Sequence, residues 1–361
     1  MIPSLLLVAA VSLAVEQMPM HVVPLPVNST RLLGMSMDDD GFIWVGTFHR
    51  DAYRYDPRTG SVEVFHVPFE MKTVSQCLCA GSKVYMLGQT HPRLVIYDRA
   101  SAKFSEAAYP SAKPNVWYGT DLIDDHTLFF FDRGSAGAIR WDTRTDTGTP
   151  IPFPYGTPLP SSGQFVAADG AVWCRLWGGT GFQYKPVGIV RLDVADGKFT
   201  GMWEFPKDDA GLEPFTVPAT TIFLPFTLKG KIVPFDFKSK RWCRFLDVPR
   251  FGELFGFIGG PTPHDGRLFF SLSTYNGTDT GCDGKPFHFC NAMLEFDPST
   301  RRFEFPTLAV EGAYHQVAYM LSAGGAFYAT GCNIRESDGT LNRDRSGEFV
   351  FLQSRPLKAA K

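Results

Sequence analysis

Two histidines and the polar residues that follow them are the side chains of this sequence best suited to chemistry. His49 and His91 lie 42 residues apart, each in a polar segment between two apolar runs, and Tyr118 and Arg133 belong to the next such unit. Histidine and tyrosine act as general acids and bases. An arginine neutralises a carboxylate and stabilises the negative charge that develops when a neighbouring proton is removed. These residue types predict proton abstraction from a carboxylate-bearing substrate.

The same segments contain few carboxylates, and no convincing facing pair of the kind that glycoside hydrolysis usually requires. We therefore expect β-elimination, in which a histidine or Tyr118 removes the proton, Arg133 stabilises the charge, and a second acid protonates the leaving oxygen. Corresponding positions elsewhere in the chain predict the substrate-binding residues, which are Arg50, Arg93, Arg175, Trp177, Tyr275, His315 and Arg335.

Each candidate also has a simpler explanation. The two histidines are equally consistent with surface loops that have no chemical task. Tyr118 and Trp177 are also consistent with packing inside the fold. Arg133 is also consistent with a solvated ion pair with Asp132 or Asp142, which contributes little stability.

A repeat positions these candidates. An apolar or aromatic residue, then Asp, then a turn occurs six times, with Asp-to-Asp steps of 42, 44, 51, 43 and 61 residues. A recurrence in this range is typical of repeat architectures, and four short strands per repeat form a propeller blade. The copies are Tyr55-Asp56, Tyr97-Asp98, Trp141-Asp142, Leu192-Asp193, Phe235-Asp236 and Phe296-Asp297.

The pattern predicts an all-β fold, a seven-bladed β-propeller of four-stranded antiparallel blades. The last repeat, ending near Phe351, lacks an outer strand of its own, so we expect the N-terminal segment His21–Pro26 to supply it and close the ring. Polar loops of several blades then meet at one mouth of a central channel, the default position for a site. After the first blade, the predicted blades span about 73–110, 115–153, 163–206, 213–249, 253–307 and 315–356.

The first repeat carries a family resemblance. Gly41–Thr47 (GFIWVGT) and Tyr53–Gly60 (YRYDPRTG) resemble the repeat of streptogramin-lyase-type propellers and of the sensor propellers of two-component regulators. The match is close over this repeat and partial in the second and sixth. The resemblance implies a propeller fold and, for the streptogramin lyases, lactone opening by elimination with a catalytic histidine and a magnesium ion. Propeller polysaccharide lyases, which are more distantly similar, use histidine, tyrosine and arginine on uronic-acid substrates.

The N-terminus predicts export. Ile2–Val15 is apolar and uncharged, too short to span a bilayer with ease. The small residues Ser12 and Ala14 suit signal-peptidase cleavage before Val15. We expect residues 1–14 to be a signal peptide and 15–361 to be one propeller domain, secreted, or periplasmic in a bacterium. Two Asn-x-Ser/Thr sequons, at Asn28 and Asn276, agree with a secreted glycoprotein.

Composition bounds the cofactors and partners. Lys plus Arg is 35 against 37 Asp plus Glu, which leaves a net charge of −2 and disfavours nucleic acid as a partner. Seven cysteines include no Cys-x-x-Cys pair, so cysteine-bound metal is not expected, and Cys282 with Cys290 is the best disulfide candidate. We expect no organic cofactor and leave a divalent metal ion open. The expected partner is an acidic carbohydrate or another carboxylate-bearing substrate, with no membrane contact after signal cleavage and a monomeric chain.

The sequence is consistent with three functions. The first is a secreted lyase that cleaves a uronate-containing poly- or oligosaccharide by β-elimination. The second is a non-catalytic propeller that binds a glycan or a protein. The third is a lactone-opening enzyme similar to the streptogramin lyases.

Overall fold

The computed structural model describes the chain except for residues 1–16, 24, 26–31, 48, 89–90, 121, 136, 157–158, 179–184, 227–230, 249–254, 275–287, 305–306, 310–315, 334–347 and 355–361. The predicted signal peptide, both sequons and Cys282 of the predicted disulfide therefore lie outside the described residues. Among the described cysteines, Cys77, Cys174 and Cys243 are free thiols. The described residues contain no helix long and apolar enough to cross a membrane.

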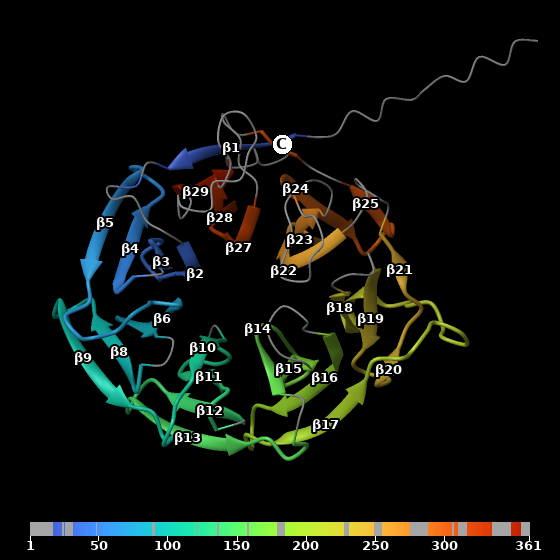
Figure 1. The fold of residues 1–361 in the computed structure, drawn as a ribbon, viewed down its shortest axis with the longest axis horizontal. Coiled ribbons are helices and arrows are strands. Elements are labelled where there is room, and N and C mark those ends of the chain that lie inside the picture. Colours follow the sequence, from blue (N-terminus) through green and yellow to red (C-terminus); the bar gives the residue numbers. More distant parts are fainter. Residues whose placement is uncertain are drawn as a thin grey trace, which may run out of the picture.

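Consecutive strands pair antiparallel into blades that stand side by side in a ring, with the first strand of each blade innermost (Figure 1). The all-β propeller predicted from the repeat is therefore confirmed. The blades from the first half of the chain consist of β2 (Leu32–Met37), β3 (Ile43–Thr47), β4 (Asp51–Asp56) and β5 (Ser61–His66); β6 (Gln76–Ala80), β7 (Lys83–Leu87), β8 (Arg93–Asp98) and β9 (Lys103–Ala108); β10 (Val116–Gly119), β11 (Thr127–Asp132), β12 (Gly137–Asp142) and β13 (Thr147–Pro152); and β14 (Leu159–Ala168), β15 (Ala171–Gly178), β16 (Lys185–Asp193) and β17 (Phe199–Glu204).

The second half of the chain continues the ring with a single short 3-10 helix among the described residues. Its outer strands are shorter, and in one blade two short strands pair with the same neighbour, β19. The elements are η2 (Pro218–Thr220), β18 (Thr221–Phe226), β19 (Lys231–Asp236), β20 (Arg241–Trp242) and β21 (Leu246–Asp247); β22 (Phe255–His264), β23 (Arg267–Thr274), β24 (His288–Asp297), β25 (Arg302–Glu304) and β26 (Thr307–Ala309); and β27 (Gln316–Ala323), β28 (Ala326–Asn333) and β29 (Glu348–Ser354).

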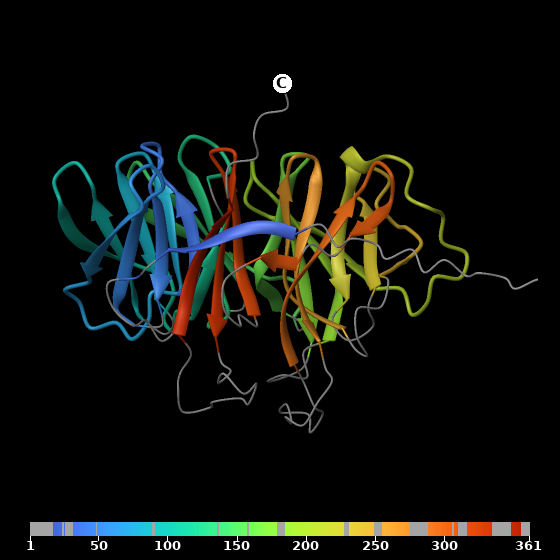
Figure 2. The same ribbon diagram turned by 90° about the horizontal axis from the view of Figure 1, so that it is seen from above.

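The N-terminal strand closes the ring, as predicted, but it lies earlier in the sequence than expected. β1 (Gln17–Val23) pairs antiparallel with β29, placing Met20 opposite Ser354 and Val23 opposite Phe351. Its first three residues also pair parallel with β26, so β1 connects two blades along the rim (Figure 2). Of the predicted strand His21–Pro26, only His21–Val23 belongs to β1, which begins four residues earlier, at Gln17.

The hydrophobic core lies between neighbouring blades. Trp44 of β3 packs against Tyr97 of the next blade, with ring centroids 5.7 Å apart, and Trp173 of β15 packs against Phe235 at 5.5 Å. Both tryptophans are almost fully buried. Because alternate side chains of a strand point to opposite faces of the sheet, each blade buries one face against each neighbour. Ring closure therefore stabilises every blade.

The six repeated aspartates cap the turns between the third and fourth strands. Each carboxylate accepts a hydrogen bond from the backbone N–H two residues later, at 2.8 to 3.0 Å. The residue four positions after each aspartate has a positive φ, between 51° and 75°. Glycine adopts this conformation without cost, whereas other residues do so at about 1–2 kcal/mol. These six residues are Gly60, Ala102, Asp146, Gly197, Lys240 and Arg301.

The two ends of the ring differ. The turns between first and second strands, and between third and fourth, form what we call the hairpin end, which is the upper face in Figure 2. The connections between second and third strands form the opposite face, which we call the loop end. Residues 48–50, 88–92 and 133–136 are such connections, so the predicted candidates His49, His91 and Arg133 belong to the loop end.

Candidate functional site

Two tyrosines meet at the centre of the ring. Tyr118 belongs to β10 and Tyr319 to β27, innermost strands of two blades that are not neighbours and that face one another across the ring (Figure 1). Their hydroxyl groups form a hydrogen bond, and their ring centroids are 5.9 Å apart. Tyr118 was predicted as a site residue, whereas Tyr319 was not. The centre of the ring is therefore bridged by two phenol groups that can exchange a proton.

Local irregularities in the inner strands aim both tyrosines. The register of β10 against β11 shifts between Val116 and Gly119, next to Tyr118. The register of β27 against β28 shifts between Val317 and Tyr319. A β-bulge bends its strand and re-aims the side chains beside it, and bulges often occur next to functional sites. Both tyrosines thus lie next to register shifts, which also occur in the inner strands β2, β14 and β22.

His49 lies at the same end of the ring as Tyr118. Its side chain is exposed, and its backbone oxygen accepts a hydrogen bond from Val74 N–H at 3.0 Å. Two residues further on, Gln76 of β6 accepts a hydrogen bond from Gly119, the neighbour of Tyr118. A continuous series of backbone and side-chain contacts thus connects the His49 loop to the strand that carries Tyr118.

The structure does not bring His91 to this group. Its side chain is 8% exposed, and its Nε2 lies 2.8 Å from a carboxylate oxygen of Glu106. Glu106 belongs to β9, the outermost strand of that blade, and also pairs with Arg93 at 3.4 Å. Both predicted residues are thus engaged at the rim, where the histidine and arginine fasten a loop to an outer strand. His49 and His91 thus occupy equivalent positions in the repeat but have different surroundings, since the first is exposed and the second is buried against Glu106.

Arg133 is half-buried at the loop end, and its backbone N–H donates to Asn115 O at 3.2 Å. The two carboxylates suggested as its ion-pair partners have other donors. Asp132 accepts hydrogen bonds from the backbone of Asn115 and Gly134 and from the hydroxyl of Ser135. Asp142 pairs with Arg144 at 2.7 Å. The carboxylate of Asp132 therefore fixes the two loops on either side of Arg133.

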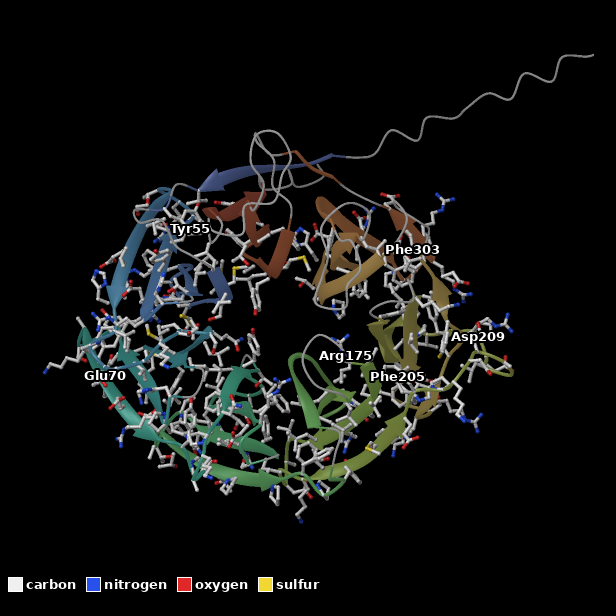
Figure 3. The ribbon with its side chains drawn as sticks, in the orientation of Figure 1. Tyr55, Glu70, Arg175, Phe205, Asp209 and Phe303 are labelled. Atoms are coloured by element: carbon white, nitrogen blue, oxygen red, sulfur yellow. The ribbon has the colours of Figure 1, made fainter. Side chains whose placement is uncertain are left out.

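Arg175 is buried on the inner side of the ring, with 4% of its surface exposed. Figure 3 shows its side chain between the β14–β17 blade and the β18–β21 blade, whereas Phe205 and Phe303 lie toward the rim. Burial lowers the pKa of the Arg175 guanidinium well below its ordinary value, because the charged form loses hydration there. Arg50, by contrast, is exposed beside His49. Tyr275, His315, Arg335 and the side chain of Trp177 lie outside the described residues.

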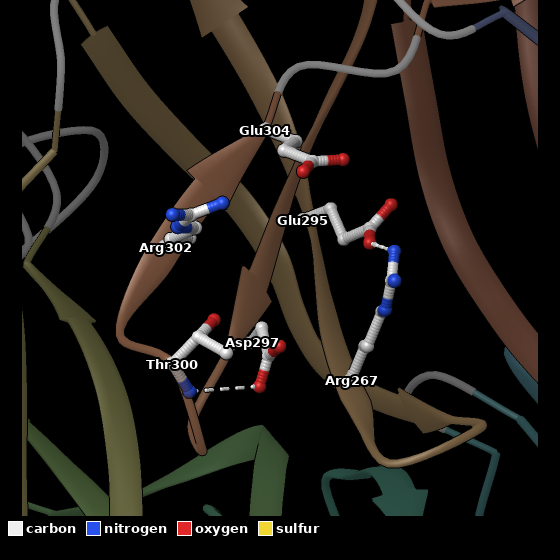
Figure 4. A pocket seen from close by; sticks show the side chains of 6 residues that line it. All are labelled: Arg267, Glu295, Asp297, Thr300, Arg302 and Glu304. Carbon is white, nitrogen blue, oxygen red and sulfur yellow. Dashed lines mark hydrogen bonds and ion pairs between the residues drawn. The ribbon is translucent and has the colours of Figure 1, made fainter.

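A metal centre does not emerge from the described part of the chain, where no three His, Cys, Asp or Glu residues gather as ligands. A cavity of about 150 Å³ occurs on the β22–β25 blade (Figure 4). Arg267 and Glu295 form an ion pair there, and Asp297 caps its turn through Thr300 N–H at 3.2 Å. Two arginines and three carboxylates line this cavity, so the charges of its walls largely offset one another. Its other lining residues are Arg302 and Glu304.

Comparisons with known proteins identify the fold class. No protein-family model matches the sequence, and no curated protein matches it. Solved structures do match. One is a catalytically inactive histidine-to-alanine variant of virginiamycin B lyase from Staphylococcus aureus with quinupristin. It is 14% identical to this chain, and the match covers 93% of this chain and 99% of that chain with a TM-score of 0.62. A streptogramin B lyase is 14% identical, covering 93% and 97%, with a TM-score of 0.60. The Pan2 WD40 domain of Neurospora crassa is 11% identical, covering 95% of each chain, also at 0.60. At such identities the likeness shows a β-propeller fold.

Proposed function

We propose that this chain is a carbon–oxygen lyase that acts by β-elimination at the loop end of the ring. The observation that carries the proposal is the hydrogen bond between Tyr118 and Tyr319 at the centre of the ring. Two phenols in contact form an acid–base pair, and positioned proton transfer contributes about 10²–10⁴-fold to a rate. We assign the positive charge that the reaction needs to Arg133 and the proton donor to His49, both of which belong to the loop end.

The proposed reaction divides among four residues. Tyr118, as phenolate, takes the proton from the carbon next to a carboxylate or ester carbonyl. A hydrogen bond donated by Tyr319 favours the ionised form of Tyr118. The arginine at position 133 stabilises the enolate-like charge. The carbon–oxygen bond at the next carbon then breaks, a double bond forms, and His49 gives a proton to the departing oxygen.

Two substrate classes share this chemistry, and they differ in their support. A cyclic ester is favoured by the structural likeness to virginiamycin B lyase, one of whose structures holds quinupristin. In that structure alanine replaces a histidine and the variant is catalytically inactive, which ties a histidine to catalysis in that protein. A uronate-containing saccharide is favoured by the predicted Arg, His and Tyr side chains at the loop end. In both cases the carbonyl group acidifies the proton that is removed, and no metal ion enters the proposed steps.

A non-catalytic binding propeller is the second candidate. The observation that favours it is the hydrogen bond between His91 and Glu106, which holds one predicted catalytic histidine against the outermost strand of its blade. The likeness to the Pan2 WD40 domain is nearly as close as that to the lyases. For either function we infer that the chain acts after export, on the strength of the apolar segment Ile2–Val15.

A substrate panel separates these functions. The purified chain is incubated with quinupristin, with virginiamycin B and with a series of acidic polysaccharides, while the absorbance of a new conjugated double bond is followed. Binding to the same compounds is measured in parallel by calorimetry. Elimination opens a cyclic ester without changing its mass, whereas hydrolysis adds one water. Binding without any unsaturated product would overturn the lyase and favour the binding propeller.

A further inference from the structure

A glutamine from a neighbouring blade holds the backbone beside Tyr118. Gln76 is the first residue of β6, and its side-chain oxygen accepts a hydrogen bond from Gly119 N–H at 2.8 Å. The register of β10 against β11 shifts between Val116 and Gly119. A bulge leaves backbone groups outside the regular ladder, and a buried N–H without a partner is costly. The Gln76 oxygen satisfies this N–H and thereby stabilises the bulge.

A glycine on the neighbouring strand leaves room for the Gln76 side chain. Gly34 of β2 lies opposite Gln76 in a parallel pairing, and Gly34 N–H donates to Ser75 O at 3.0 Å. A methyl group at position 34 would lie 2.7 Å from Cγ of Gln76, closer than such atoms approach. The glycine therefore makes the space in which the glutamine side chain crosses from one blade to the next.

The partner tyrosine has an equivalent arrangement. Tyr319 N–H donates to the hydroxyl oxygen of Thr330 at 3.2 Å, and Thr330 is 1% exposed. The register of β27 against β28 shifts between Val317 and Tyr319. Each of the two central tyrosines is thus located at a bulge where a side chain accepts a backbone N–H. For Tyr118 the accepting side chain comes from a different blade.

We infer that Gln76 is a positioning residue, which sets the Tyr118–Tyr319 contact through Gly119. The inference rests on the proposed function for its effect on catalysis, but the contact itself is measurable without a substrate. Leucine at position 76 has a similar volume and accepts no hydrogen bond, so the bulge loses its cross-blade acceptor. Glutamate keeps an acceptor oxygen at the same place. Leucine at position 76 should therefore loosen the backbone that positions Tyr118, whereas glutamate should keep it in place.

The experiment is a double-mutant cycle measured by urea unfolding. Tyr118→Phe, Tyr319→Phe and the double variant give the coupling between the two hydroxyls, first with Gln76 present and then in a Gln76→Leu background. We expect the coupling to be lost in Gln76→Leu and restored in Gln76→Glu. Gln353→Leu is the matched control, because Gln353 is a buried glutamine that accepts a hydrogen bond from Tyr55. It should lower stability and leave the coupling unchanged.

Persistence of the coupling in Gln76→Leu would overturn the positioning role, and so would its loss in Gln353→Leu. If Gln76→Leu does not fold, Gly34→Ala serves instead, because it displaces the glutamine without removing it. On a confirmed substrate, Gln76→Leu should lower kcat with little change in KM. A chain that turns over no substrate, but whose coupling still depends on Gln76, would sink the proposed function alone.

Discussion

The hydroxyl groups of Tyr118 and Tyr319 form a hydrogen bond across the centre of the ring, although 201 residues separate the two tyrosines along the chain. The contact exists only when the blades that carry β10 and β27 are held in a closed ring. Because β1 pairs with both β26 and β29, the N-terminal strand contributes directly to that closure.

Deleting residues 1–23 should therefore abolish the contact and destabilise the whole chain. The deletion opens the edges of β26 and β29 and removes Val23, which is 3% exposed in the core between the blades. We expect a loss of more than about 3 kcal/mol in the free energy of unfolding, since several ladder hydrogen bonds at roughly 0.5–1.5 kcal/mol each disappear together with apolar burial.

Thermal unfolding and size-exclusion chromatography check this expectation. Deletion of residues 1–14 is the control, because it leaves β1 complete. A synthetic peptide covering 17–23 should restore part of the lost stability in trans. Equal melting temperatures for the two deletions would contradict the role assigned to β1.

The two histidines predicted as equivalents should respond differently to alanine substitution. His91→Ala removes a buried partner of Glu106 and should lower stability by about 1–3 kcal/mol while leaving turnover unchanged. His49→Ala, on an exposed loop, should change stability by less than about 0.5 kcal/mol and reduce turnover. Urea unfolding and steady-state kinetics of both variants check this. Loss of turnover in His91→Ala without loss of stability would reverse the assignment.

Acid should destabilise the ring through the repeated aspartates. A side-chain hydrogen bond from Arg144 holds the pKa of Asp142 well below its usual range, and one from Ser299 does the same for Asp297. Partial burial raises the pKa of Asp193 and Asp236, but hydrogen bonds outweigh it and the net direction is downward. The pKa values of Asp56 and Asp98 are shifted in the same direction. The folded-state pKa values of these aspartates lie below the unfolded ones. Their contribution to the free energy of unfolding is therefore complete above about pH 4, and it disappears as the pH falls through the folded-state pKa values.

Urea midpoints measured between pH 7 and pH 2 check the direction. The midpoint should fall below about pH 4, and the difference between wild type and Asp297→Asn should shrink in the same range. Asp209→Asn is the control, because Asp209 is half-buried near the rim and lies outside the repeat turns (Figure 3). A difference that stays constant down to pH 2 would contradict the capping role.

The sequence contained enough to predict the propeller, because one turn recurs six times along the chain. Aspartate caps that turn through its own side chain, and the glycines at positions 60 and 197 mark the positive φ that the turn needs. Ala102 and Lys240 occupy the same backbone position without any such signal, since the surrounding turn imposes their conformation. Pattern and turn chemistry therefore suffice for the fold.

The contacts at the centre of the ring were harder to predict from the sequence. Tyr319 carries no motif, and its contact with Tyr118 depends on two bulges and on closure of the ring, which sequence periodicity does not encode. The contact of His91 with Glu106 was not predicted, because the equivalence of two loops says nothing about the outer strand. The pairing of β8 with β9 puts Arg93 opposite Ala108, so the end of β9, which contains Glu106, lies close to the loop that contains His91. The position of a polar loop was predictable, whereas the direction of its side chains was not.

The most direct test of the lyase at the tyrosine pair is the rate at which wild type and Tyr118→Phe form an unsaturated product, measured by absorbance and by product mass on a cyclic ester and on an acidic polysaccharide. We predict that wild type produces the double bond on one of these substrates. The variant, still folded, should be slower by about 10²–10⁴-fold, the contribution of a positioned acid–base group. Equal rates for the two proteins, a product heavier by one water, or no unsaturated product from wild type on either substrate would contradict it.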